Sequence, residues 1–224
     1  MKHEYQNETV VSKLKCTPSR QPLLTGAKAR TRHLLLSTAL NKLEEGWLPS
    51  ITELAKEAGV ARATAYRYFP TQSALVSAVV DESLGPILSW QPTEITAEKR
   101  VSELLSFAYP RMLEHEGALR ATLQVSLQQW AEEKANKQQN SERLIRGHRK
   151  KILALATEPL QNTLPADNYQ RLQYALSLVY GSEIFMVLKD IWDLDSGDID
   201  DVTQWMAKAL INQAQADAEK SAGG

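Results

Sequence analysis

Apolar residues recur every three or four positions from Lys28 onward, which is the period of one face of an α-helix. The first series comprises Leu36, Leu40, Leu43 and Trp47. Gly46 lies at its end, and glycine commonly terminates helices because it adopts the left-handed conformation without strain. The pattern therefore predicts a helix that begins near Lys28 and ends at about Gly46.

Two shorter helices are predicted next. Ser50 is followed three residues later by Glu53, a pair that forms a capping box at the start of a helix. This second helix ends at Gly59 after about two and a half turns. A third helix covers approximately residues 61–69, and Pro70 closes it because proline interrupts the backbone hydrogen bonds of a helix.

The remaining sequence predicts a fourth helix from about Thr71 and five more helices beyond a junction at residues 85–92. The longest of these begins after Pro165 and continues to about Trp192. No segment alternates between apolar and polar residues, so we expect an all-α protein of about nine helices. The predicted units are an arm (1–27), an N-terminal domain (28–85), a second helical domain (86–216) and a disordered tail (217–224).

The net charge of −1 conceals an uneven distribution along the chain. Residues 1–72 contain 11 basic and 6 acidic residues, whereas residues 73–224 contain 15 basic and 21 acidic residues. Such asymmetry indicates a basic, anion-facing N-terminal part on an acidic C-terminal part. The arm is interpreted either as a disordered tail or as a basic segment that contacts DNA phosphates.

Several classes of function are excluded by what the sequence lacks. Cys16 is the only cysteine, so neither an intramolecular disulfide nor a cysteine zinc cage is expected. The four histidines lack metal-ligand spacing, the acids of residues 193–201 do not fit a calcium loop, and no catalytic motif is present. We therefore expect no enzyme, cofactor or metal. Without a spanning apolar run or a signal segment, we expect a cytoplasmic protein with no membrane partner.

Residues 50–75 are the most informative stretch of the sequence. Two short helices joined by a glycine-containing turn are the pattern of a helix-turn-helix. Ala55 is small where the helices cross, and Val60 fills the space between them. The predicted third helix contains no acidic residue, and an acid-free surface suits a helix that enters a phosphate-lined groove. Its outward residues are polar, cationic and aromatic: Arg62, Thr64, Tyr66, Arg67 and Tyr68.

The same stretch resembles the DNA-binding domain of the TetR/AcrR family of bacterial transcriptional regulators. The resemblance covers about residues 28–80 and rests on Gly59-Val60, Thr64, the Tyr66–Pro70 ending and Ala74-Leu75. Residues 181–195 resemble the last helices of such regulators more weakly. Two departures are notable: Ala61 stands where the family often has a capping Ser or Thr, and Gln72 stands where it often has Lys.

The resemblance implies a double-stranded DNA partner with a palindromic operator. Arg62 would read a guanine edge, while Ala63 and Thr64 would face bases. Phosphate contacts would come from the remaining residues: Ser50, Thr52, Tyr66, Arg67, Tyr68 and Gln72. The alternative is that Tyr66 and Tyr68 pack on the first helix and that Arg62 is merely solvated.

A homodimer is expected because the predicted helix of residues 165–192 is apolar on two faces and must be buried on both sides. The resemblance implies the same dimer, formed by the last two helices. The expected interface residues are Gly181, Phe185, Leu188, Trp192, Trp205, Met206 and Leu210.

The resemblance also implies a small-molecule effector whose binding releases a repressor from its operator. The candidate lining residues are Tyr109, Met112, Leu127, Trp130, His148, Tyr174 and Glu183. Each of them is alternatively ordinary core, and Glu183 could pair with an arginine rather than with a ligand. Two other functions stay open: a regulator without an effector, and a helical ligand-binding or scaffold protein with a vestigial DNA-binding domain.

Overall fold

The computed structural model describes residues 26–135 and 148–222, so nearly all of the predicted arm lies outside the described residues. Within them the chain forms eleven α-helices, one short 3-10 helix and no strand, which confirms the all-α class. The α-helices are α1 (Ala27–Glu44), α2 (Ile51–Glu57), α3 (Arg62–Tyr68), α4 (Gln72–Ser83), α5 (Gly85–Leu88), α6 (Ala97–Glu114), α7 (Glu116–Lys134), α8 (His148–Thr157), α9 (Ala166–Val179), α10 (Glu183–Leu188) and α11 (Ser196–Ala222), and the 3-10 helix is η1 (Glu158–Leu160).

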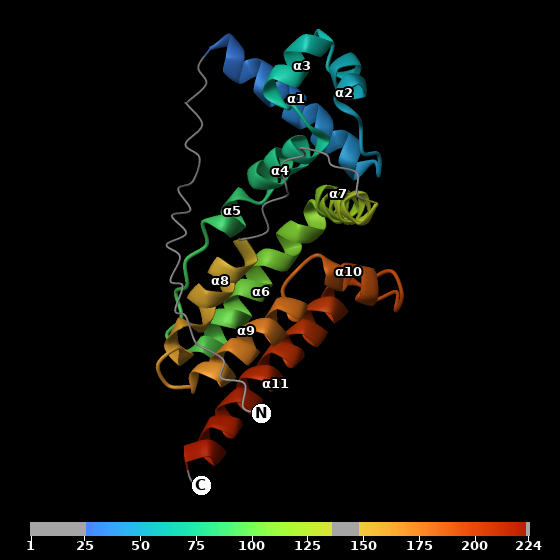
Figure 1. Cartoon of the computed structure of the whole chain (residues 1–224). Coiled ribbons are helices and arrows are strands. Elements are labelled where there is room, and N and C mark those ends of the chain that lie inside the picture. Colours follow the sequence, from blue (N-terminus) through green and yellow to red (C-terminus); the bar gives the residue numbers. More distant parts are fainter. Residues whose placement is uncertain (1–25, 136–147, 223–224) are drawn as a thin grey trace, which may run out of the picture.

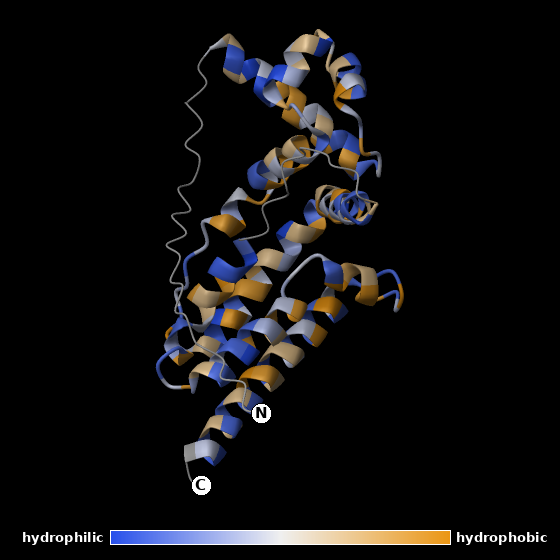
Figure 2. Ribbon diagram, viewed as in Figure 1, coloured by the Kyte–Doolittle hydropathy of each residue, from blue (hydrophilic) through white to orange (hydrophobic). Residues whose placement is uncertain are grey.

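The helices form two parts, which we call the head (α1–α4) and the body (α5–α11). The head lies at one end of the elongated molecule, and α6, α8, α9 and α11 run side by side in the body (Figure 1). Most helices carry both apolar and polar residues (Figure 2), as expected for helices with one buried face. The described helices include none that is long and apolar enough to cross a membrane.

Each part has its own apolar core. In the head, Leu35, Leu54 and Leu75 are completely buried and bring α1, α2 and α4 together. The body core is formed mainly by α6, α8, α9 and α11, through residues such as Leu104 and Leu176. The two parts therefore each bury enough apolar surface to be held by the hydrophobic effect.

Helix α7 belongs to both parts. Its buried residues Ala118, Ala121 and Val125 are members of the head core, whereas Leu119 belongs to the body core. The junction is tight at Gly117, where a Cβ atom would overlap the carbonyl oxygen of Leu43. Only glycine allows the end of α1 to approach the first turn of α7 so closely.

The local signals of the head are confirmed. The Ser50 hydroxyl accepts a hydrogen bond from the Glu53 backbone N–H at 3.2 Å, and the Glu53 carboxylate accepts one from the Ser50 N–H at 2.8 Å. Gly46 and Gly59 both have positive φ, at 78° and 64°, which glycine adopts without strain. Both turns are therefore built as the sequence predicted.

The single long helix predicted between Pro165 and Trp192 is wrong. The chain leaves the helical conformation at Tyr180 (φ −93°, ψ 101°) and resumes it as the short helix α10. Tyr180 is buried, and Gly181 weakens helix continuity there. Because α10 turns away from α9, the two apolar faces that we expected on one continuous helix belong to two separate helices.

The predicted disordered tail also differs from the structure. Helix α11 continues without interruption to Ala222. In its last turns Ala214 and Ala218 still pack against the body core, and Asp217 lies 3.9 Å from Arg171 of α9. The polar composition of residues 217–222 hid these contacts, because the helix uses small alanines rather than large apolar residues.

Substituting Gly117 by alanine tests the tight junction between head and body. Because the new Cβ would overlap the Leu43 carbonyl, we expect a destabilisation of about 1–3 kcal/mol, measured by urea unfolding. The matched control is Gly197→Ala in the first turn of α11, where the Cβ meets only the flexible Asp195 carboxylate, at 3.3 Å. Equal stabilities of the two variants would show that the junction has room for a side chain.

Substituting Ser50 by alanine tests the capping box. We expect the free energy of unfolding to fall by about 1 kcal/mol, whereas Ser37→Ala within α1 costs less than about 0.5 kcal/mol.

The hydrogen bond from Ser50 holds the pKa of Glu53 below its ordinary value of 4.5. Glu53 therefore stabilises the fold above that pH, and the stability difference from Glu53→Gln should vanish in more acidic solution. If the stability difference between wild type and Glu53→Gln does not change with pH, the Glu53 carboxylate does not stabilise the start of α2 through its charge.

Candidate nucleic-acid interface

Helix α3 lies on the head with one face buried and the other outward. Ala65 is completely buried, and Phe69, which caps the C-terminal end of the helix, is also in the head core. The exposed residues of α3 are Arg62, Ala63, Tyr66 and Arg67, and Thr64 and Tyr68 are half-buried. The outward surface therefore consists of two arginines, an alanine and aromatic and hydroxyl groups, with no carboxylate of its own.

The turn between α2 and α3 fixes their crossing. Gly59 has φ 64°, and the Val60 N–H donates to the Ala55 carbonyl at 2.9 Å. Val60 packs against the head core, as predicted. Ala61 begins α3 without a side-chain cap, so the departure noted at this position leaves the first amides of α3 without a hydroxyl partner.

The Thr52 side chain of α2 contacts the Tyr66 side chain of α3. The Thr52 hydroxyl lies 3.4 Å from the Tyr66 hydroxyl, and the Arg62 guanidinium stacks over the Tyr66 ring at 5.3 Å. The hydrogen bond with Thr52, helped by Arg62, lowers the pKa of Tyr66. Thr52, Arg62 and Tyr66 are thus brought together on one outward face, and cation–π stacking orders the arginine before any ligand arrives.

Tyr68 combines the two alternatives that the sequence left open. Its hydroxyl donates to the Lys28 carbonyl at 3.2 Å, so Tyr68 does pack on α1. Its ring also carries the Arg67 guanidinium at 5.7 Å. Tyr68 therefore supports Arg67 on the outward surface, while its own hydroxyl is engaged within the head.

Gln72 and Ser50 are less available than expected. The Gln72 side-chain nitrogen donates to the carbonyl oxygens of Pro49, at 2.9 Å, and Leu48, at 3.4 Å. These bonds hold the segment before α2 and engage the Gln72 side-chain nitrogen. The Ser50 hydroxyl and N–H are both engaged with Glu53, whose carboxylate sits at the start of α2. These two residues hold α2 and its preceding segment in place. The capping box predicted the Ser50–Glu53 pair, whereas no sequence signal pointed to the carbonyl partners of Gln72.

The residues predicted to line a ligand cavity are not brought together. Tyr109 and Met112 are buried in the body core, whereas Leu127, Trp130, Tyr174 and Glu183 are exposed. Burial raises the pKa of Tyr109, whose hydroxyl donates to the Val179 carbonyl at the end of α9.

Two other candidates of this set have charged neighbours. Glu183 pairs with Arg149 at 2.5 Å, which matches the alternative of an arginine partner, and His148 lies 3.7 Å from Asp81. Among the described residues, no cluster of His, Cys, Asp and Glu could hold a metal ion.

The residues predicted to form a dimer interface fall into three groups. Phe185 is buried against the Tyr109 ring at 5.9 Å, and Gly181 packs beneath Arg149 and Glu183. Both serve the core of one chain, because the helix break turns them inward. Trp192 and Trp205 are instead 69% and 72% exposed. Leu188, Met206 and Leu210 are half-buried against the body core.

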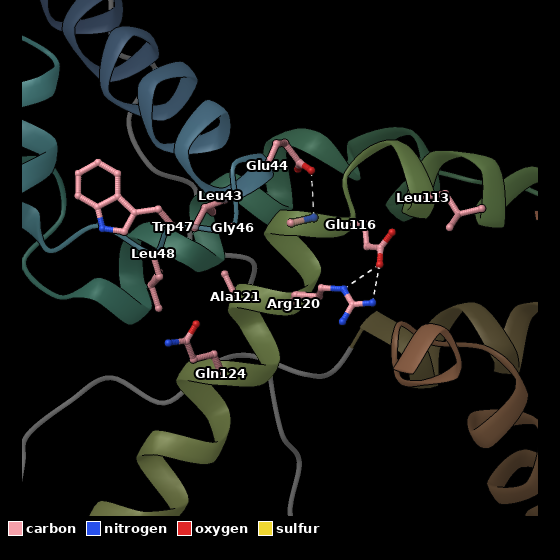
Figure 3. A pocket seen from close by; sticks show the side chains of 11 residues that line it. Leu43, Glu44, Gly46, Trp47, Leu48, Leu113, Glu116, Arg120, Ala121 and Gln124 are labelled. Carbon is pink, nitrogen blue, oxygen red and sulfur yellow. Dashed lines mark hydrogen bonds and ion pairs between the residues drawn. The ribbon is translucent and has the colours of Figure 1, made fainter. Parts of the chain in front are cut away.

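A groove of about 390 Å³ lies where the head meets α7 (Figure 3). Its walls come from the end of α1 and the following turn, including Trp47, and from the first turns of α7, including Glu116 and Arg120. None of the seven predicted ligand-lining residues borders it. Glu44 and Arg120, which carry the contacts of this junction, were missed by sequence reasoning because their partners lie about 70 residues away in the chain.

Comparisons with known proteins agree with this geometry. Residues 44–79 match the sequence model of the bacterial regulatory proteins of the tetR family. No curated protein matches the chain. A TetR transcriptional regulator from Rhodococcus sp. RHA1 has a similar structure, with a TM-score of 0.55 and 21% identity over 81% of this chain and 96% of that chain.

A tetR-family transcriptional regulator from Streptomyces coelicolor is also similar, with a TM-score of 0.59 and 16% identity over 89% of this chain and 87% of that chain. The matched segment, residues 44–79, contains α2, α3 and the turn whose geometry is described above. Residues 44–79 therefore form a helix-turn-helix that matches the sequence model of the bacterial regulatory proteins of the tetR family, and the chain as a whole has the fold of the two solved transcriptional regulators.

Proposed function

We propose that this chain is a homodimeric transcriptional regulator that binds a palindromic operator in the bacterial cytoplasm and performs no enzymatic reaction. The observation that carries the proposal is the outward face of α3, where Arg62 and Arg67 are exposed, ordered by aromatic rings and free of neighbouring acids on the same helix. Such a face suits the major groove, whose rims are phosphates.

The roles of the two arginines differ in this proposal. Arg62 stands at the first position of α3, so its guanidinium reads a base edge by bidentate hydrogen bonds. Arg67 stands in the last turn beside Tyr68, where it contacts phosphate and fixes the register of the head on the duplex. Thr52 and Tyr66 present hydroxyls on the same face as further phosphate donors, with Ala63 and Thr64 against the bases.

The dimer is supported by apolar residues that one chain leaves in water. Tyr174 and Leu178 lie one turn apart on α9 and are 65% and 79% exposed. Trp192 follows α10, and Trp205 lies on α11. Tyr174 and Leu178 form an exposed apolar pair on one helix, and exposed apolar patches mark interaction surfaces. A twofold dimer buries the same surface of both copies. Two heads then match the two halves of a palindrome.

The proposal includes a repressor that a small molecule releases from the operator. The body is the proposed effector site, because Tyr109 and Met112 face its core and the Tyr109 hydroxyl is a polar group beside the break between α9 and α10. A ligand acts only through different affinities for the DNA-bound and free conformations. It would therefore have to change how the two heads are spaced.

Arginine substitutions on α3 test DNA binding, using the duplex that wild-type protein selects from a random library. Arg62→Ala should weaken binding about tenfold or more and relax sequence preference. Arg67→Ala should weaken binding similarly on all sequences and reduce the salt slope by about one. The control is Lys150→Ala, an exposed cation of α8. If both arginine variants bind like wild type and like the control, α3 does not face DNA.

Charged substitutions on α9 and after α10 test the dimer. Leu178→Asp and Trp192→Asp place a carboxylate in the proposed interface, so both should convert a dimer to a monomer at micromolar concentration, measured by sedimentation velocity. Ile95→Asp is the control, because Ile95 is 83% exposed in the segment before α6. A wild-type monomer, or variants that remain dimeric, would contradict this assignment.

A further inference from the structure

The first turns of α7 are joined to the head by polar contacts as well as by packing. The Glu44 carboxylate, at the end of α1, accepts hydrogen bonds from the backbone N–H groups of Gly117, at 3.0 Å, and Ala118, at 3.4 Å. These amides have no partner within their own helix, so the last residue of α1 caps α7. With the Gly117 contact to Leu43, this cap fixes the head to α7 on one side of the groove of Figure 3.

One turn further along, α7 is joined to α10 by a network of four charged residues. The Arg120 guanidinium forms two bonds to the Asp190 carboxylate, at 2.6 and 2.7 Å, and a third to Glu116 at 2.7 Å. Lys189 reaches the other oxygen of Glu116 at 2.5 Å. Lys189 and Asp190 directly follow α10, so this network ties the end of α10 to the start of α7.

The network is stronger than a solitary surface ion pair. Arg120 binds Asp190 in the bidentate geometry that fixes direction as well as distance. The hydrogen bond from Arg120 lowers the pKa of Asp190. Burial alone would raise the pKa of Glu116, but bonds from Lys189 and Arg120 outweigh it and lower the pKa. The two carboxylates therefore remain charged at neutral pH, and the network holds one arrangement.

We propose that Arg120 is a positioning residue that sets the orientation of the DNA-binding head relative to α10, acting through the first turn of α7. Helix α7 moves with the head because Ala118, Ala121 and Val125 are part of the head core, and Glu44 caps its start. The bond from Arg120 to Asp190 then makes the position of the head and α7 depend on the end of α10. This inference rests on the proposed function.

The position of α10 matters because its C-terminal end leads into the proposed dimer surface. Ile191 and Trp192 come directly after Asp190 and are largely exposed, in the region proposed to contact the second copy. The partner contact and the tie to the head thus lie within two residues of each other. In a dimer, this arrangement fixes the separation of the two heads, which must match half-sites about 34–36 Å apart.

Arg120→Met tests the proposal with full-length protein and three sets of duplexes: the selected operator, one half-site alone, and operators whose half-sites are moved by one or two base pairs. We expect binding to the full operator to weaken about tenfold, while half-site binding changes less than twofold. The variant should also lose wild-type preference for one spacing, which a merely stabilising residue would not control.

Asp190→Asn is the second variant, since it breaks the same tie from the α10 side and leaves Arg120 with Glu116. Arg120→Lys keeps one ion pair and should give an intermediate loss. The matched control is Lys208→Met, which removes an ion pair of 3.4 Å between α11 and α6 that does not involve α7. Thermal melting of each variant excludes unfolding, and sedimentation confirms that each remains dimeric.

The outcomes separate this inference from the proposed function. If wild-type protein binds no duplex, both fail. If wild type binds and both Arg120→Met and Asp190→Asn keep its affinity and spacing preference, Arg120 does not position the head. Equal losses on the half-site and on the full operator would also overturn the inference, because the defect would then lie within each head.

Discussion

The structure depends on one helix, α7, being buried against two different units at once. A helix shared in this way needs small side chains where a neighbouring backbone approaches closely, and α7 meets the head with Gly117, Ala118 and Ala121. At Gly117 the Leu43 carbonyl occupies the space where any Cβ would stand. Because the head core includes residues of α7, the head is not an independent attachment, and its orientation follows the body.

The polar contacts around α7 act on top of this packing. Apolar burial is non-directional and fixes that two elements touch, whereas hydrogen bonds and bidentate ion pairs also fix their angle. The hydrogen bond from Gly117 to Glu44 fixes the angle between α7 and the head. The bidentate pair of Arg120 and Asp190, one turn later, fixes the angle between α7 and the end of α10. In the proposed dimer, the two heads must match a regular duplex, and such directional contacts serve that match more than they serve stability.

The outward face of α3 shows a similar division between burial and polar contacts. Ala65 and Phe69 anchor the helix by burial. Ala63 and Arg67 lie on the opposite side by helical geometry, and Arg62 and Tyr66 are exposed along its edge. Stacking of each arginine over a tyrosine then limits its freedom, which lowers the entropy lost on binding. Gln72 and Ser50, by contrast, use their polar groups internally and contribute by holding α2 and its preceding segment in place.

The sequence by itself determined the head, because its signals act over a few residues: the Ser50–Glu53 capping box, the left-handed Gly59 and the periodic apolar face of α1. It also determined the all-α class and the acid-free surface of α3. Only the tertiary structure decided the break at Tyr180, the inward position of Phe185, the continuation of α11 and the partners of Glu44 and Arg120. These features arise from contacts between residues distant in the chain, where burial of Tyr180 and pairing across about 70 residues override local propensity. No periodicity or short motif encodes such contacts.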